Sequence, residues 1–213
     1  MKRIFTLTLT ALAASSSFAF SFSDIRFWAG TGSRQAGLVI QWSDGNTPQS
    51  LAWGYRFDGV KTGEDMFRAV VAADPRLFAY TDQFSWGYAA YGIGYDADDD
   101  GVIGTGYTTG ATPDDALAND SDDRWRTGWL TNGYWSYWTG SDGSEAAGWA
   151  SASFGMSDRT LGDGSWDALS FAPAPNWTAD PPSGIEAAVP EPGSLLAVAG
   201  GLAAFAWRRS RRR

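Results

Sequence analysis

Residues 37–57, GLVIQWSDGNTPQSLAWGYRF, bear most directly on the fold of this chain. The stretch contains two runs rich in β-branched and aromatic residues, at 37–42 and 51–57, and residues of these kinds favour strands. Between the runs lie Ser, Asp, Gly, Asn and Pro, which favour turns. The stretch therefore predicts a β-hairpin.

The hydrophobic period changes directly after this hairpin. Thr62 is a suitable N-cap, and Asp65 stands where the acidic partner of a capping box is expected. Apolar side chains then recur at positions 66, 67, 70 and 71, which is helical spacing. Asp74 precedes Pro75 and is therefore disfavoured in a helix. We expect one principal helix over about 63–73.

Strands are expected to resume after the helix, at 84–95, 133–139, 148–154 and 165–171, because these runs are aromatic-rich and bounded by Gly, Asp or Ser. The predicted fold class is α+β, with one helix laid across a mainly antiparallel β-sheet. From residue 172 the composition becomes rich in proline, which predicts an extended spacer over 172–188.

The last 24 residues combine a short motif, an apolar run and a basic tail. The motif Pro190-Glu191-Pro192 precedes 15 apolar or small residues, 193–207. As a helix this run would span roughly 22 Å, less than the roughly 30 Å bilayer core, which indicates a temporary transmembrane anchor. The tail contains five arginines that would stop translocation, with the preceding residues outside the cytoplasm: Arg208, Arg209, Arg211, Arg212 and Arg213.

Residues 189–213 resemble the PEP-CTERM sorting domain of proteins that exosortases process in Gram-negative bacteria. The resemblance implies that Pro190, Glu191 and Pro192 form the recognition motif and that a membrane enzyme of the exosortase type removes the tail. It also implies a membrane-tethered precursor at the inner membrane and a mature protein in the cell envelope, on the surface or in the extracellular matrix.

The N-terminus has the order of features found in a secretory signal peptide. Lys2 and Arg3 precede an apolar stretch at 4–14, and a small-x-small site ends at Ala19, where signal peptidase would cleave. The expected organisation is a signal peptide at 1–19, an extracellular globular domain at 20–171, the proline-rich linker at 172–188 and the sorting signal at 189–213.

Charge and composition restrict the possible functions. All 24 acidic residues but only nine of the 16 basic ones lie outside the signal peptide and the basic tail, so the exported part is strongly acidic. This disfavours nucleic-acid binding and favours divalent cations. The chain has no Cys and no His, which excludes disulfides, thiolate or imidazole metal sites and histidine-dependent triads. The broad catalytic option left is a pair of carboxylates.

The sequence DADDDGVI, residues 96–103, matches the first half of an EF-hand-type calcium loop. The ligands it predicts are Asp96, Asp98, Asp100 and the backbone carbonyl of Val102. Position twelve of the loop is Tyr107 rather than an acid. A carboxylate later in the chain could complete the calcium coordination shell, and the candidates are Asp120, Asp122 and Asp123. The alternative is that the segment is a solvated acidic loop without an ion.

Aromatic residues are concentrated between 125 and 138. Trp129, Trp135, Tyr137 and Trp138 are candidates for a platform that stacks on sugar rings or another ligand. In a strand, Trp135 and Tyr137 would share one face and Trp138 would lie on the other. Core packing is the alternative explanation for these rings.

The body of the chain also resembles the β-grasp-like domain found at the C-terminus of transcobalamin and in bacterial surface proteins. The resemblance involves the hairpin, the helix TGEDMFRAVVAADP at 62–75, the strand GYWSYW at 133–138 and the stretch LGDGSWDALSF at 161–171. It implies binding of a ligand at the surface rather than catalysis.

Three functions remain open at this point. The favoured one is an exported, non-enzymatic protein that binds a glycan, a small ligand or a surface partner, with calcium as a structural aid. The second is a carboxylate-dependent glycoside hydrolase, which needs two acids about 5–10 Å apart in an aromatic groove. The third is a purely structural matrix protein.

Overall fold

The central strands are β2 (Arg34–Gln41) and β3 (Ser50–Phe57), which pair antiparallel along their whole length. Arg34 lies opposite Phe57 at one end of the ladder and Gln41 lies opposite Ser50 at the other. The hairpin predicted over residues 37–57 is confirmed.

The computed structural model describes residues 20–85, 87–100, 123–129, 131–141, 143 and 148–190. The predicted signal peptide and the sorting segment from Glu191 onward lie outside them.

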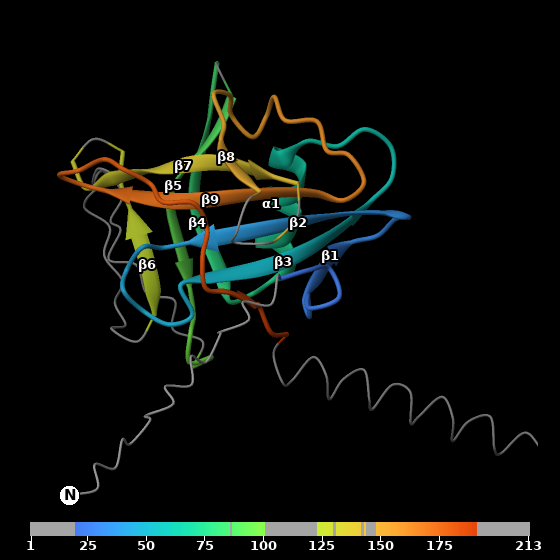
Figure 1. Ribbon diagram of the computed structural model, residues 1–213, viewed down its shortest axis with the longest axis horizontal. Helices are drawn as coiled ribbons and strands as arrows, with labels where there is room; N and C mark the ends of the chain where they lie inside the picture. The colour runs from blue at the N-terminus through green and yellow to red at the C-terminus, as the bar shows by residue number, and fades with distance from the viewer. Residues whose placement is uncertain are drawn as a thin grey trace, which may run out of the picture.

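A larger sheet is built around this hairpin in the order β1-β3-β2-β9-β7-β8, and β10 also pairs with β3 (Figure 1). Its other strands are β1 (Trp28–Gly30), β7 (Gly133–Gly140), β8 (Trp149–Ser151), β9 (Ser165–Pro173) and β10 (Ile185–Ala187). Both β1 and β10 run parallel to β3, and β9 runs parallel to β2. The remaining ladders are antiparallel, so the sheet is mixed.

A second sheet has the antiparallel order β4-β5-β6 and runs across the larger one in Figure 1. Its strands are β4 (Leu77–Phe84), β5 (Gly87–Tyr95) and β6 (Arg124–Thr127). The prediction of one strand over 84–95 was wrong at its start. Phe84 ends β4, and β5 begins at Gly87, whose φ of 136° is a value that L side chains rarely adopt.

The single helix among the described residues, α1 (Gly63–Ala73), has the predicted bounds and the predicted cap. The side chain of Thr62 accepts from the backbone N–H of Asp65, and the Asp65 carboxylate accepts from the backbone N–H of Thr62. Met66, Phe67 and Val70 are buried against the large sheet. The described part of the chain is therefore mostly β-sheet with one short helix, which confirms the coarse α+β prediction.

Strand β2 is covered on both faces. Leu38 and Ile40 point into the main core, which α1 and the second sheet close, whereas Val39 points into a smaller core with Trp166. Phe20 and Phe22 from the N-terminal segment pack against that smaller core. A strand covered on both sides carries a continuous apolar run, which explains the sequence Leu38-Val39-Ile40.

The proline-rich segment 172–188 is not the extended spacer that we expected. Its end forms β10, which pairs with β3, and the side chain of Ala188 is fully buried. The prolines precede the three residues that pair, Ile185, Glu186 and Ala187, so they remove no hydrogen bond from this ladder. The folded domain thus continues to the edge of the sorting segment.

Candidate functional site

A groove of about 450 Å³ lies between the two sheets, where neighbouring strands stop short. On one side β6 pairs with β5 only from Gly92 onward, and on the other β8 pairs with β7 only from Trp138 onward. The remaining parts of β5 and β7 border the groove. The aromatic residues that line the groove include Tyr88, Trp129, Trp135, Tyr137 and Phe154.

The four predicted platform residues do not form one surface. Trp129, Trp135 and Tyr137 line the groove, whereas Trp138 packs against the smaller core on the opposite face of β7. This separation follows the alternation of side chains along a strand. The ring of Trp129 is 38% exposed and stacks on Phe84 at 5.5 Å between centroids, so one face of the platform is supported from behind.

Trp135, which lines the groove, carries a buried polar atom. Its Nε1 is buried and has no hydrogen-bond partner among the residues that the structure describes. Leaving a buried donor without an acceptor costs about 1–3 kcal/mol. Trp138 and Trp149 also have a buried Nε1 without a partner among the described residues, whereas Trp42 donates to Ile93 and Trp53 donates to Asp74. The sequence gives no sign of which indoles find an acceptor.

Tyr137 is held in place by a buried polar network. Its hydroxyl donates to Oδ2 of Asp167, and Arg159 donates from Nε to Oδ1 of the same carboxylate at 3.1 Å. Burial raises the pKa of Asp167, and the contacts with Tyr137 and Arg159 oppose that rise. Burial and the neighbouring Asp167 also raise the pKa of Tyr137. Because its hydroxyl is occupied, Tyr137 presents its ring to the groove.

No carboxylate is among the described residues that line the groove. Glu64, in the first turn of α1, accepts from Arg68 at 2.8 Å and from Ser157 at 2.7 Å. Glu145 lies outside the described residues. The pair of acids that a glycoside hydrolase needs is therefore not found in the described wall of this groove.

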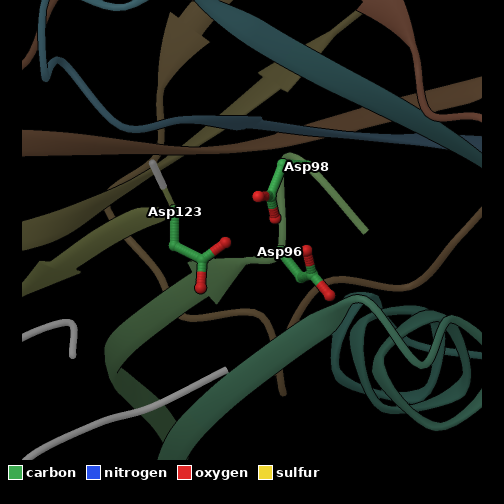
Figure 2. A group of neighbouring side chains, drawn as sticks. All are labelled: Asp96, Asp98 and Asp123. Carbon is green, nitrogen blue, oxygen red and sulfur yellow. The ribbon is translucent and has the colours of Figure 1, made fainter. Parts of the chain in front are cut away.

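Three aspartates meet at the other candidate site. One ligand oxygen from each of Asp96, Asp98 and Asp123 lies within 4.8 Å of the other two (Figure 2). Asp96 directly follows β5 and Asp123 directly precedes β6. The pairing of Tyr95 with Arg124 in those strands brings the acids together.

The fit to the predicted calcium loop is partial. Asp96 and Asp98 are members of the cluster, Asp123 takes the part of the distant closing acid, and Asp100 is not in the group. Val102, Asp120 and Asp122 lie outside the described residues. Oxygen ligands of this kind suit Ca²⁺, which takes six to eight of them.

Backbone donors shape the cluster. Oδ1 of Asp123 accepts from the N–H of Ala97 at 3.0 Å, and Oδ1 of Asp96 accepts from the N–H of Asp99 at 2.6 Å. Arg76 donates to the backbone carbonyls of Asp96 and Ala97 at 2.8 and 2.9 Å, so this guanidinium fixes the loop and partly balances its charge.

The described chain ends beside β3. Ala188 donates its N–H to the carbonyl of Ala52 at 2.9 Å, and Pro190 is the last described residue. The recognition motif predicted from the sequence starts at this point.

Residues 188–213 match the PEP-CTERM protein-sorting motif.

This match confirms the assignment made from the sequence. A PEP-CTERM motif marks an exported protein that exosortase processing converts from a membrane-anchored precursor to a surface protein. Within the described residues no helix has the length and apolar character needed to cross a bilayer. The expected transmembrane run 193–207 and the five arginines lie outside those residues.

The body of the chain finds no counterpart in these comparisons. Neither the curated proteins nor the solved structures contain a significant match. The expected similarity to the transcobalamin-type β-grasp domain is therefore not supported.

Proposed function

We propose that the folded body is a non-catalytic binding domain that presents the aromatic groove to a carbohydrate chain at the cell surface. The observation that carries the proposal is that Trp129, Trp135 and Tyr137 line one groove, in which the rings of Trp129 and Phe154 are exposed. Sugar rings offer C–H faces that pack on aromatic rings.

The supported ring of Trp129 favours binding over simple core packing. An exposed tryptophan stacked on Phe84 is already fixed in orientation, so little side-chain entropy is lost when a ligand covers its outer face. Tyr137 is similarly fixed, through Asp167. A pre-organised aromatic wall is what a binding module needs.

A glycan array followed by calorimetry tests this proposal on residues 20–190. We expect binding of at least one polysaccharide class, and a loss of about ten-fold or more in affinity with Trp129→Ala, since stacking of this kind contributes on the order of 1 kcal/mol or more. Val60→Ala is the control, because Val60 is an exposed apolar residue (81%) that does not line the groove.

The outcomes separate the three candidate functions. Binding that Trp129→Ala removes and Val60→Ala leaves intact supports the groove. Hydrolysis of a bound glycan would instead support the glycoside hydrolase, and silence on every glycan would support the structural matrix protein.

We also propose that Asp96, Asp98 and Asp123 bind calcium as a structural ion. The three carboxylates are close enough to repel one another, and calcium outside the cell reaches the 10⁻⁴–10⁻³ M range that extracellular calcium modules use. The ion would stabilise the junction of β5 and β6, remote from the groove lining.

A further inference from the structure

Strand β10 completes one edge of the central strand. Along this edge of β3, β10 covers Ser50–Ala52 and β1 covers Gly54–Arg56, while β2 covers the opposite edge. Ile185 of β10 packs into the smaller core beside Val39 and Trp166. The strand is therefore part of the fold, although it lies only a few residues before the sorting motif.

The segment in front of β10 satisfies polar side chains that the sheet buries. Oε1 of Gln41 accepts from the N–H of Ser183 at 2.8 Å, Ser50 donates to the carbonyl of Ser183 at 2.8 Å, and Ser170 donates to the carbonyl of Asp180 at 2.7 Å. Gln41, Ser50 and Ser170 are all buried. Undocking this segment from the sheet would break each of these hydrogen bonds. The segment and β10 are therefore both held on the sheet.

Docking of β10 leaves almost no free chain before the sorting motif. Ala188 has a fully buried side chain, and its N–H is bonded to Ala52. Only Val189 and Pro190 separate Ala188 from Glu191, and three steps at about 3.3–3.6 Å per residue give a reach of at most about 11 Å. A processing enzyme must bind its motif as exposed chain in a concave site, and a folded domain this close obstructs that access.

We propose that β10 is a latch that controls processing: the exosortase-type enzyme gains full access to Pro190-Glu191-Pro192 only while β10 is undocked from β3. Docking of β10 then competes with removal of the tail, and a molecule that finishes folding first stays longer as the tethered precursor. This inference rests on processing at the matched sorting motif and uses no residue of the groove.

The decisive experiment lengthens the chain between the latch and the motif. A ten-residue Gly/Ser insertion between Ala188 and Val189 leaves β10 docked but adds roughly 17–19 Å of flexible reach. The full-length precursor is followed by pulse-chase in cells that contain the exosortase-type enzyme. We expect the tail to be removed several-fold faster in the insertion variant than in the parent.

The same insertion between Gly59 and Val60 is the matched control. This site lies between β3 and α1, and Val60 is 81% exposed. We expect no change in processing rate there. If the insertion after Ala188 also leaves the rate unchanged, or if no variant is processed at all, the latch proposal is overturned.

A second variant undocks the strand itself. Ile185→Asp places a carboxylate in the smaller core, which disfavours docking of β10, and should also speed processing. Glu186→Gln, at an exposed position of the same strand, should not. Circular dichroism of the processed proteins checks that the body folds. An Ile185→Asp rate equal to or below that of Glu186→Gln contradicts the latch.

Discussion

The indole Nε1 of Trp53 donates a 2.7 Å hydrogen bond to Oδ2 of Asp74, and both side chains are buried. Trp53 lies on β3, and Asp74 is the C-cap of α1. The bond therefore fixes the end of the helix on the centre of the large sheet. Oδ1 of Asp74 also accepts from the backbone N–H of Arg76 at 3.0 Å, so the same carboxylate directs the chain from α1 into β4.

Replacing Trp53 by phenylalanine should lower the free energy of unfolding, because the buried carboxylate of Asp74 loses a hydrogen-bond donor. Burial raises the pKa of Asp74, while the hydrogen bonds from Trp53 and Arg76 oppose the rise. Loss of the indole donor leaves the ionised acid less well solvated, and we expect a loss of about 1–3 kcal/mol in the free energy of unfolding at pH 7.

The pH dependence gives this prediction its test. In the folded state the raised pKa of Asp74 favours stability below the unfolded value near 3.8, and this benefit is lost as the pH rises through the folded pKa. The Trp53→Phe substitution should raise the pKa of Asp74 further. The loss in free energy of unfolding relative to the parent should therefore be smaller near pH 4 than at pH 7. Urea titrations at both pH values measure the difference; equal deficits would argue against an ionised Asp74.

Local signals were enough to predict the hairpin and α1. Both depend on contacts between residues close in sequence, such as the reciprocal bonds of Thr62 and Asp65. The short strands β1 and β10 have no such signal, because each consists of three residues whose pairing partner is the distant edge of β3. Composition suggested a spacer where the chain in fact docks.

The candidate sites show the same limit. The calcium motif identified Asp96 and Asp98, included Asp100, which is not in the cluster, and left Asp120, Asp122 and Asp123 as candidates for the closing acid. Asp123 joins the cluster because β6 pairs with β5. Trp138 falls outside the groove by strand alternation, whereas Phe154 enters it from the loop after β8. A pattern along the chain gives residue types and faces, and the sheet pairing decides which of them meet.

Calcium should raise the melting temperature of the exported domain. Binding to the folded state alone adds about 2.7 kcal/mol when the free ion is at 100 times its Kd. Asp98→Asn and Asp123→Asn should each reduce or abolish the shift, since each removes a charged ligand. Asp158→Asn, at an exposed position outside the cluster, should keep it. A melting curve that is the same with calcium and with chelator would refute the site.

Gly63→Ala should destabilise the protein even though alanine is the better helix former. A Cβ at residue 63 would overlap the hydroxyl of Tyr137 and lie 3.0 Å from Oδ2 of Asp167. Overpacking of a buried site typically costs about 1–3 kcal/mol, and here it would also disturb the ring of Tyr137 in the groove wall.

Gly155→Ala is the control for this substitution, because a Cβ there meets nothing within 4 Å. We expect Gly155→Ala to be neutral or slightly stabilising in thermal unfolding. If Gly63→Ala behaved in the same way, the close contact between α1 and Tyr137 would be wrong.

The stabilisation from the ion pair of Asp44 and Arg124 should be sensitive to acid. Nη2 of Arg124 lies 2.7 Å from Oδ1 of Asp44 and Nε lies 3.0 Å from Oδ2, with side chains only 4% and 10% exposed for Arg124 and Asp44. Arg124 also donates to the carbonyl of Gln49 and lies over the ring of Trp42, so it fastens the loop between β2 and β3 to β6.

Asp44→Asn removes the charge of one partner and leaves a buried guanidinium unbalanced, which costs about 3–5 kcal/mol at pH 7. Burial by itself raises the pKa of Asp44, but contacts led by the hydrogen bond from Arg124 outweigh it, and the pKa lies below its ordinary value. The stabilisation is thus present above the unfolded pKa and is lost as the pH falls through the folded one.

The difference in free energy of unfolding between the Asp44→Asn variant and the parent should therefore become smaller as the pH falls toward 3. Chemical denaturation across the pH range measures this difference. Lys61→Gln is the comparison, because its pair with Asp65 is 3.8 Å apart and about 40% exposed. Exposed pairs contribute about 0–1 kcal/mol, so this variant should stay close to the parent throughout. A deficit for Asp44→Asn that does not change with pH would mean that the loop, rather than the charge of Asp44, carries the stability.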